Sequence, residues 1–231
     1  RRKYFFEIST KVTLYAIWED TTPPTVAFSI NGGTFAKPTF GNATVKTKVT
    51  ADDNESGLKT TQYIWSTSTT QPTSGWTTFT NGSSISKNDC IVGNYYLWIK
   101  AIDNENNTYI THSNAFSIIN ATITITPNTT SWTNKDITGT VAYSNSILIN
   151  RKAGYGTTLE EAQKNISTNT STKIIAPENG YFYAEATDSM GNKVYESLQI
   201  TKIDKISPSK PEIKEIGGAY DILIQFTPKD N

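Results

Sequence analysis

The sequence predicts an all-β fold built from tandem β-sandwiches, and three observations lead to this expectation. The chain has 231 residues, whereas a small sandwich domain has about 100. Thr, Ser and Asn account for 77 residues, and 5 Trp, 12 Tyr and 9 Phe accompany many Ile and Val residues. Thr, aromatic and β-branched residues fit a pleated strand, whereas Asn, Ser and Gly supply turns. Finally, one stretch of sequence recurs at a fixed offset, which indicates tandem modules.

The repeated stretch divides the chain into modules. Four residues of segment 93–107 recur 85 residues later: Tyr96 as Tyr181, Ala101 as Ala186, Asp103 as Asp188 and Asn107 as Asn192. Stretches containing proline, at 19–24 and 204–211, flank the repeats as extended linkers would. We therefore expect the closing strand of a preceding β-repeat at 1–20, sandwiches at 21–119 and 120–204, and a linker with the start of a third sandwich at 205–231.

The first sandwich is expected to contain seven short strands, because alternating apolar residues and turn clusters mark the segments 25–31, 43–51, 58–66, 76–80, 83–87, 94–102 and 108–118. Alternation in 94–102 predicts which side chains face the core. They are Leu97, Ile99 and Ala101, with Phe182, Ala184 and Ala186 as their counterparts in the second repeat. Tyr96, Trp98 and Lys100 should then lie on the outer face.

One short helix is expected in the second sandwich. Thr158 and Glu161 have the spacing of a capping box, in which each residue satisfies a free backbone N–H of the first helical turn. Residues 159–164 should therefore form a helix, and we expect almost no helix elsewhere.

Composition excludes several classes of function. Lys and Arg number 21 and Asp and Glu number 21, so the formal charge is zero, and nucleic-acid binding needs a basic surface. No apolar run approaches the ~18 residues that insertion in a membrane requires. One His and one Cys are too few for a Cys/His zinc site. His112 has no neighbouring carboxylate in the sequence that would mark it as a catalytic base. We expect Cys90 to be a buried structural residue. The chain is therefore not expected to be an enzyme.

Several motifs together resemble a known family. They are Thr21-Thr-Pro-Pro-Thr25, Asp53-Asn-Glu-Ser-Gly-Leu58, Tyr63-Ile-Trp-Ser66, Gly75-Trp-Thr77, the strand 95–104 and Ala186-Thr-Asp-Ser-Met-Gly-Asn192. Over residues 20–204 these motifs resemble the bacterial Ig-like repeats of Gram-positive surface proteins. Segment 11–18 resembles the closing strand of an internalin-type β-repeat. Segments 211–214 and 221–226 resemble the first strands of a third, fibronectin-III-like module, so we expect the chain to be a piece of a longer protein.

The resemblance implies tandem Ig-like or fibronectin-III-like β-sandwiches in a secreted, extracellular protein of the bacterial cell surface. It implies a stalk or spacer, or part of an adhesin, with the other modules of the same longer chain as partners. The alternatives are a module that binds carbohydrate or a host surface protein, accessory domains of a secreted carbohydrate-active enzyme, and a phage tail decoration. The family's turn motif ends in Gly-Asn, whereas the first module has Glu105-Asn-Asn107, so an Asn should adopt the left-handed conformation there.

Acidic residues in the loops of the first module suggest a structural Ca²⁺ site, and no other cofactor is expected. In a sandwich the loops after 43–51 and after 94–102 should meet the entering linker at one end. Ca²⁺ takes six to eight oxygen ligands from carboxylates and carbonyls. The candidate ligands are Asp20, Asp52, Asp53, Glu55 and Asp103. The alternative is that these residues form Asx turns and solvated loop tips.

Three aromatic residues are candidates for stacking on sugar rings. Trp76 follows a turn, and Tyr96 and Trp98 belong to the outer face of their strand. Exposed aromatic residues are also ordinary cross-strand partners on a solvated sheet face, so this interpretation competes with a structural one.

Overall fold

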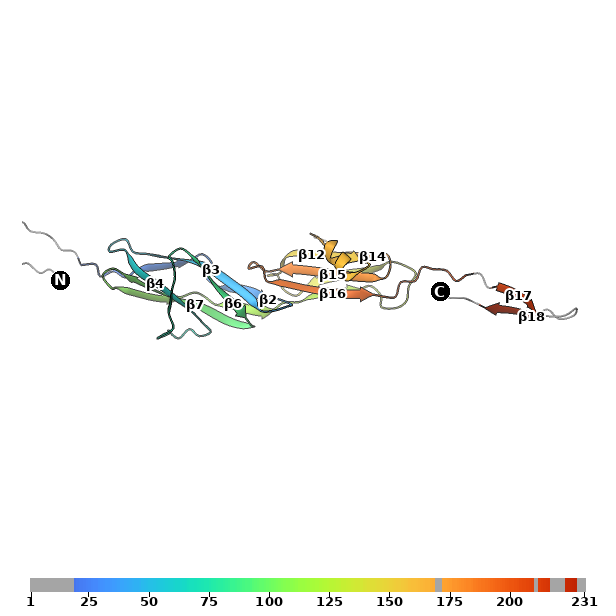
Figure 1. Ribbon diagram of the computed structural model, residues 1–231, viewed down its shortest axis with the longest axis horizontal. Coiled ribbons are helices and arrows are strands. Elements are labelled where there is room, and N and C mark those ends of the chain that lie inside the picture. The colour runs from blue at the N-terminus through green and yellow to red at the C-terminus, as the bar shows by residue number, and fades with distance from the viewer. Residues whose placement is uncertain (1–18, 169–171, 210–211, 217–222, 228–231) are drawn as a thin grey trace, which may run out of the picture. The chain divides into compact units, whose positions relative to one another are not determined.

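The computed structural model describes residues 19–168, 172–209, 212–216 and 223–227, and their fold is almost entirely β (Figure 1). These residues belong to two compact units. Of the described residues, unit 1 comprises 19–33, 46–87 and 94–117, and unit 2 comprises 34–45, 88–93 and those from 118 onward. The predicted borders of the two sandwiches, 21–119 and 120–204, stay a prediction.

The first nine strands are β1 (Thr25–Phe28), β2 (Gly33–Lys37), β3 (Ala43–Asp52), β4 (Leu58–Ser66), β5 (Thr77–Thr78), β6 (Ser84–Cys90), β7 (Gly93–Asp103), β8 (Thr108–His112) and β9 (Phe116–Asn120). One sheet has the order β1-β3-β6 and the other the order β2-β9-β7-β4-β5, with β8 also paired to β7. The core of unit 1 combines Val49 and Ile85 of the first sheet with Leu97 and Ile99 of the second, which is the packing of a β-sandwich.

Most predicted strands of this region are confirmed, with two differences. Strand β2 was missed, because it begins at the second residue of a glycine pair, ends directly before Pro38 and alternates weakly. The predicted strand 108–118 is broken into β8 and β9. Ser113 bridges the break, since its N–H donates to the Leu97 carbonyl and its hydroxyl accepts from the Leu97 N–H.

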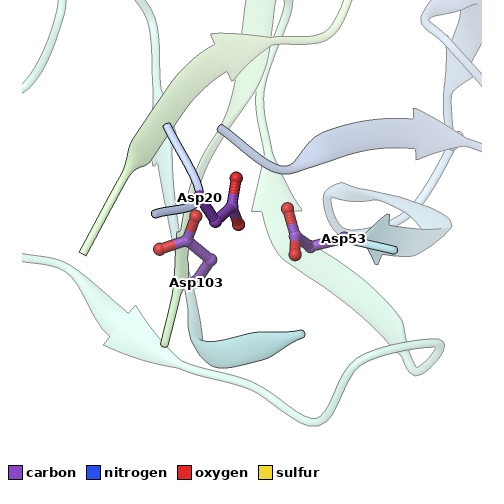
Figure 2. Close-up of side chains that lie close together, drawn as sticks. All are labelled: Asp20, Asp53 and Asp103. Atoms are coloured by element: carbon purple, nitrogen blue, oxygen red, sulfur yellow. The ribbon is translucent and has the colours of Figure 1, made fainter. Parts of the chain in front are cut away.

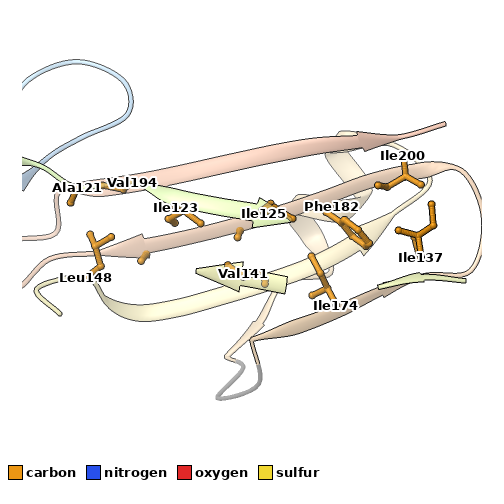
Figure 3. Packing of buried hydrophobic residues seen from close by; sticks show 14 of the residues in the cluster. Ala121, Ile123, Ile125, Ile137, Val141, Leu148, Ile174, Phe182, Val194 and Ile200 are labelled. Atoms are coloured by element: carbon orange, nitrogen blue, oxygen red, sulfur yellow. The ribbon is translucent and has the colours of Figure 1, made fainter. Parts of the chain in front are cut away.

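Unit 2 contains the strands β10 (Ile123–Pro127), β11 (Ile137–Tyr143), β12 (Ile149–Gly156), β13 (Ser167–Thr168), β14 (Lys173–Ala176), β15 (Gly180–Thr187) and β16 (Lys193–Ile200). They form sheets of order β10-β11-β14 and β13-β12-β15-β16. Apolar side chains from both sheets pack together, among them Ile123, Val141 and Phe182 (Figure 3). The fold class expected from the sequence is therefore confirmed as an all-β, sandwich-type architecture.

Phe182 shows how tightly this core is filled. Its side chain is fully buried, as the alternation predicted, and so are Ala184 and Ala186. A Cβ on Gly139 would lie 2.7 Å from the Phe182 ring, so the glycine of β11 leaves the space that the ring occupies. If the Phe182 ring were removed, the surrounding side chains could not move in to fill the cavity, because the backbone hydrogen bonds of both sheets hold them in place.

The single helix of the described residues, α1 (Leu159–Lys164), has the predicted bounds. Thr158 caps it by accepting the Glu161 N–H at 3.1 Å. The Glu161 carboxylate accepts from the N–H of Thr157, one residue before the cap, at 2.8 Å. The Thr157 hydroxyl also donates to this carboxylate. The pKa of Glu161 is lowered, first by this hydroxyl bond and then by the bond from the Thr157 N–H. No helix in this part of the chain could cross a membrane.

Strands β17 (Glu212–Ile216) and β18 (Leu223–Thr227) pair antiparallel near the C-terminus, where two strands were expected. Their assignment to a third sandwich stays a prediction. The expected closing strand at 11–18 lies outside the described residues.

We predict that Phe182→Ala lowers the free energy of unfolding of unit 2 by about 3–5 kcal/mol, because it leaves a cavity between two fixed sheets. Urea unfolding measures this loss. Ile175→Ala is the control: its side chain is 58% exposed in β14, and a change of less than about 0.5 kcal/mol is expected. Similar losses for the two variants would contradict the described core.

Candidate functional site

The two repeated Asp and Asn pairs form the same kind of turn. In unit 2 the Asp188 N–H donates to the Asn192 carbonyl, and the Gly191 N–H donates to the Asp188 carbonyl. Asp103, Asn106 and Asn107 repeat this pattern in unit 1. Gly191 has φ +88° and Asn106 has φ +70°, so the prediction of a left-handed Asn in the first module is confirmed.

In unit 2 this turn binds the backbone of a segment that is distant in sequence. Asp188 Oδ2 accepts the Ala36 N–H at 2.8 Å. Asn192 Oδ1 accepts the Thr44 N–H at 2.9 Å, and Asn192 Nδ2 donates to the Thr44 carbonyl at 3.2 Å. Because Asn192 satisfies both backbone groups of one residue, it pairs with Thr44 as a neighbouring strand would.

We call this arrangement, one Asn side chain bonded to the N–H and the C=O of a single residue, a peptide clasp. Two more clasps occur. Asn81 holds Ala51 with bonds of 2.7 and 2.8 Å, and Asn179 holds Ile203 with bonds of 2.8 and 3.1 Å. Each clasp ties a strand end or a connecting segment to a turn, so several Asn residues act as structural ties as well as turn formers.

The turn of unit 1 has fewer hydrogen-bond donors. The carboxylate of Asp188 accepts from the Met190, Asn192 and Ala36 N–H groups and from Asn192 Nδ2. The carboxylate of Asp103, which is fully buried, accepts only from the Asn107 N–H and Nδ2 within the described part of the chain. Asn107 Nδ2 also donates to the Asp20 carbonyl at 3.0 Å. A buried carboxylate needs compensation of its charge, and Asp103 receives less of it than Asp188.

Two further carboxylates lie beside Asp103. Figure 2 shows Asp20, Asp53 and Asp103 directed toward one another from three different segments, and one oxygen of each lies within 4.8 Å of the others. Asp53 is fixed by a loop in which its Oδ1 accepts the N–H groups of Glu55, Ser56 and Gly57. Asp20 Oδ1 accepts the Thr22 N–H, whereas its Oδ2 is buried and has no hydrogen-bond partner.

The structure thus brings together three of the five acidic residues that the sequence singled out. Glu55 lies beside this group, and its carboxylate accepts from the Thr22 hydroxyl at 3.2 Å. Asp52 is outside the group. It is the last residue of β3, and alternation turns it to the exposed face. Carboxylate oxygens are ligands that Ca²⁺ takes, so the three Asp residues fit this ion chemically.

The charges of this cluster act on one another. The pKa of Glu55 is raised, first by the closeness of its side chain to that of Asp20 and also through repulsion by that carboxylate. The pKa of Asp20 is lowered, first by the nearby polar side chain of Ser56 and then by the hydrogen bond from the Thr22 N–H, which stabilise its charged form.

The aromatic candidates have different exposures. Trp76 and Tyr96 are half-buried. Trp98 is only 5% exposed, so the expectation that it presents an open ring is wrong. Its Nε1 donates to the Ser68 carbonyl at 3.2 Å and its ring lies 4.5 Å from that of His112, because a loop and a neighbouring strand cover this sheet face.

Trp132 is an exposed aromatic residue that sequence reasoning missed. It is 69% exposed in the connection between β10 and β11. Backbone bonds hold this connection, since Thr133 donates its N–H to Lys202 and accepts from the Asp204 N–H. No alternating pattern marks Trp132 in the sequence, and only the tertiary structure shows that the described residues leave most of its ring exposed.

The single His and Cys have structural surroundings. His112 Nδ1 lies 2.7 Å from the Ser113 carbonyl, and its ring contacts Tyr96 and Trp98. Cys90 is fully buried.

Comparisons with known proteins give two weak structural similarities. No protein-family model matches it, and no curated protein matches it in sequence. A structure of the fibronectin(III)-like modules of Clostridium thermocellum CbhA is similar over 78% of this chain and 95% of that one, at 11% identity and a TM-score of 0.37. The D00-D0 domain of intimin is similar over 77% of this chain and all of that one, at 12% identity and a TM-score of 0.30. The fold assignment rests on the sheets and cores themselves.

We predict that Asn192→Ala lowers the free energy of unfolding of unit 2 by about 1–3 kcal/mol, because the Thr44 peptide and the Asp188 carboxylate both lose partners. Hydrogen exchange at the Thr44 amide should become faster. The matched control is Asn88→Ala, which removes only an exposed bond to the Thr44 hydroxyl. Unchanged exchange at Thr44 in the first variant would contradict the clasp.

Proposed function

We propose that this chain is a non-catalytic, extracellular segment of a bacterial surface protein, where it serves as a spacer or stalk within an adhesin. The observation that carries the proposal is the peptide clasp of unit 2. The turn of Asp188 and Asn192 fixes the backbone at Ala36 and Thr44, more than 140 residues earlier in the chain. A spacer needs segments that stay fixed to one another, and such backbone bonds supply this without depending on side-chain identity in the bound segment.

The surface chemistry agrees with this role. Formal charge is zero, and Thr, Ser and Asn supply a third of the residues, so the exposed strand faces are polar without a field that would attract nucleic acid. The partners that we propose are the other modules of the same longer chain. The resemblance to bacterial Ig-like repeats supports the same role by analogy of fold.

A display experiment tests the spacer role. The whole chain is fused between a cell-surface anchor and a small sugar-binding reporter domain, and capture of the cells on sugar-coated beads is measured. We expect capture to fall when the chain is deleted and to be restored by an unrelated tandem sandwich of equal length. Capture that does not depend on the chain would overturn the proposal.

Carbohydrate or host-protein binding is the alternative, and exposed Trp132 favours it together with half-buried Trp76 and Tyr96. Aromatic rings on ordered loops provide stacking surfaces. In the same display assay, capture of the chain without the reporter on polysaccharide or host-protein beads, lost in Trp132→Ala or Trp76→Ala, would replace the spacer role by a binding role.

We propose, as a second function, that unit 1 holds a structural Ca²⁺ between Asp20, Asp53 and Asp103. Three observations support it: the oxygens within 4.8 Å, the buried and unpartnered Asp20 Oδ2, and the few donors to Asp103. In unit 2 backbone N–H groups compensate the equivalent carboxylate, and in unit 1 the cation would take their place.

We predict that saturating Ca²⁺ raises the melting temperature of unit 1 by roughly 5–10 °C and that EDTA reverses the effect. The direction in which this Ca²⁺ effect changes with pH follows from Glu55. Because its pKa is raised, the folded protein keeps a proton on it to higher pH than the unfolded chain, and Ca²⁺ would expel this proton. The Ca²⁺ effect should therefore be largest near neutral pH and shrink as pH falls toward about 4.5.

Two variants separate this site from general ion effects. Asp20→Asn keeps an acceptor for the Thr22 N–H but removes the charge, and it should abolish the response to Ca²⁺. Asp52→Asn removes an adjacent exposed carboxylate outside the cluster and should respond as the wild type does. A melting temperature that ignores Ca²⁺ in the wild type, or an Asp20→Asn variant that responds fully, would rule the site out.

A further inference from the structure

The chain contains three Asn-Gly pairs, and their surroundings differ. They are Asn31-Gly32, Asn81-Gly82 and Asn179-Gly180. An Asn followed by Gly can lose its side-chain amide because the small Gly leaves its backbone nitrogen accessible to the Asn side chain. The reaction therefore depends on whether the two reacting groups are free to meet.

Asn81-Gly82 is restrained at both reacting groups. The Asn81 amide is held in a peptide clasp, with the Ala51 N–H at 2.7 Å from Oδ1 and the Ala51 carbonyl at 2.8 Å from Nδ2. The Gly82 N–H donates to the Val49 carbonyl at 2.9 Å. Attack would require three hydrogen bonds to open together.

Asn31-Gly32 has one restraint only. Asn31 Oδ1 accepts the Asn114 N–H at 2.8 Å. Within the described part of the chain, Asn31 Nδ2 and the Gly32 N–H make no hydrogen bond, and Asn31 is exposed to water. The backbones are matched, since Gly32 has φ +79° and Gly82 has φ +80°. The two pairs therefore differ in hydrogen bonding, and in the backbone of Asn114 and Ala115 that packs against Gly32, but not in the φ angle of the glycine.

We propose that Asn31 is a site of spontaneous deamidation in the folded protein, and that the clasps protect Asn81 and Asn179 from the same reaction. The Gly32 backbone nitrogen loses its proton and attacks Cγ of Asn31. The bond from Cγ to the side-chain nitrogen breaks, and this nitrogen leaves as ammonia with the proton. Water then opens the cyclic imide at either carbonyl and leaves an aspartyl or an isoaspartyl residue at position 31.

The product changes the chain at the connection between β1 and β2. Either product adds one negative charge to a chain whose formal charge is zero. An aspartyl side chain still accepts the Asn114 N–H. The isoaspartyl form lengthens the backbone next to Gly33, whose N–H donates to the Ala115 carbonyl at 2.8 Å, and this bond should weaken.

The test follows deamidation of the intact chain in mildly alkaline buffer by peptide mapping with mass spectrometry, and isoaspartyl residues by enzymatic methylation. We expect position 31 to react on the order of ten- to a hundred-fold faster than positions 81 and 179, because fewer hydrogen bonds must open. In denaturant the three rates should converge.

Asn31→Gln serves as the matched control, because its longer side chain would need a larger ring, and it should remove the fast reaction while positions 81 and 179 react as before. Equal rates at positions 31 and 81 in the folded protein would overturn the proposal. So would a folded chain that stays unmodified at position 31 while the denatured chain reacts there.

Discussion

A buried aspartate inside a short turn is the interaction on which both units depend. Asp103 is the last residue of β7 and Asp188 directly follows β15, and both side chains are buried. Burial of a carboxylate is costly unless hydrogen-bond donors or cations compensate it. The turn supplies some donors itself, and the rest must come from another segment. The need of one buried carboxylate for hydrogen-bond donors or a cation therefore determines which segment packs against the end of each central strand.

The two units meet this demand in different ways. In unit 2 the distant Ala36 N–H completes the set, and Asn192 binds the neighbouring Thr44 peptide. In unit 1 the neighbours of Asp103 are two more carboxylates and the backbone of Asp20. One repeated motif thus leads to a tie between peptide segments in one place and to an acidic cluster suited to a cation in the other. The difference lies in the partner segments and not in the turn.

Asparagine has a wider role than its usual place in turns. An Asn side chain carries one acceptor and one donor group at nearly the spacing of a peptide, so it can stand in for a strand where no strand is present. Asn81, Asn179 and Asn192 use it in this way. A chain with one Cys cannot form an internal disulfide, and these clasps fix its connecting segments instead. In Asn81 and Asn179 the same bonds occupy the side-chain amide that would otherwise react with the following glycine.

The sequence by itself determined the features that depend on neighbouring residues. Alternation placed β4 and β7 to within a residue and oriented Leu97 and Phe182 inward, the capping residues fixed α1, and the missing glycine predicted the left-handed Asn106. Only the tertiary structure decided what these elements meet. It buried Trp98 beneath a loop, left Trp132 exposed, brought Asp53 together with Asp20 and Asp103, and gave Asp188 a donor at Ala36. Such outcomes depend on which distant segments pack together, and local spacing carries no information about that.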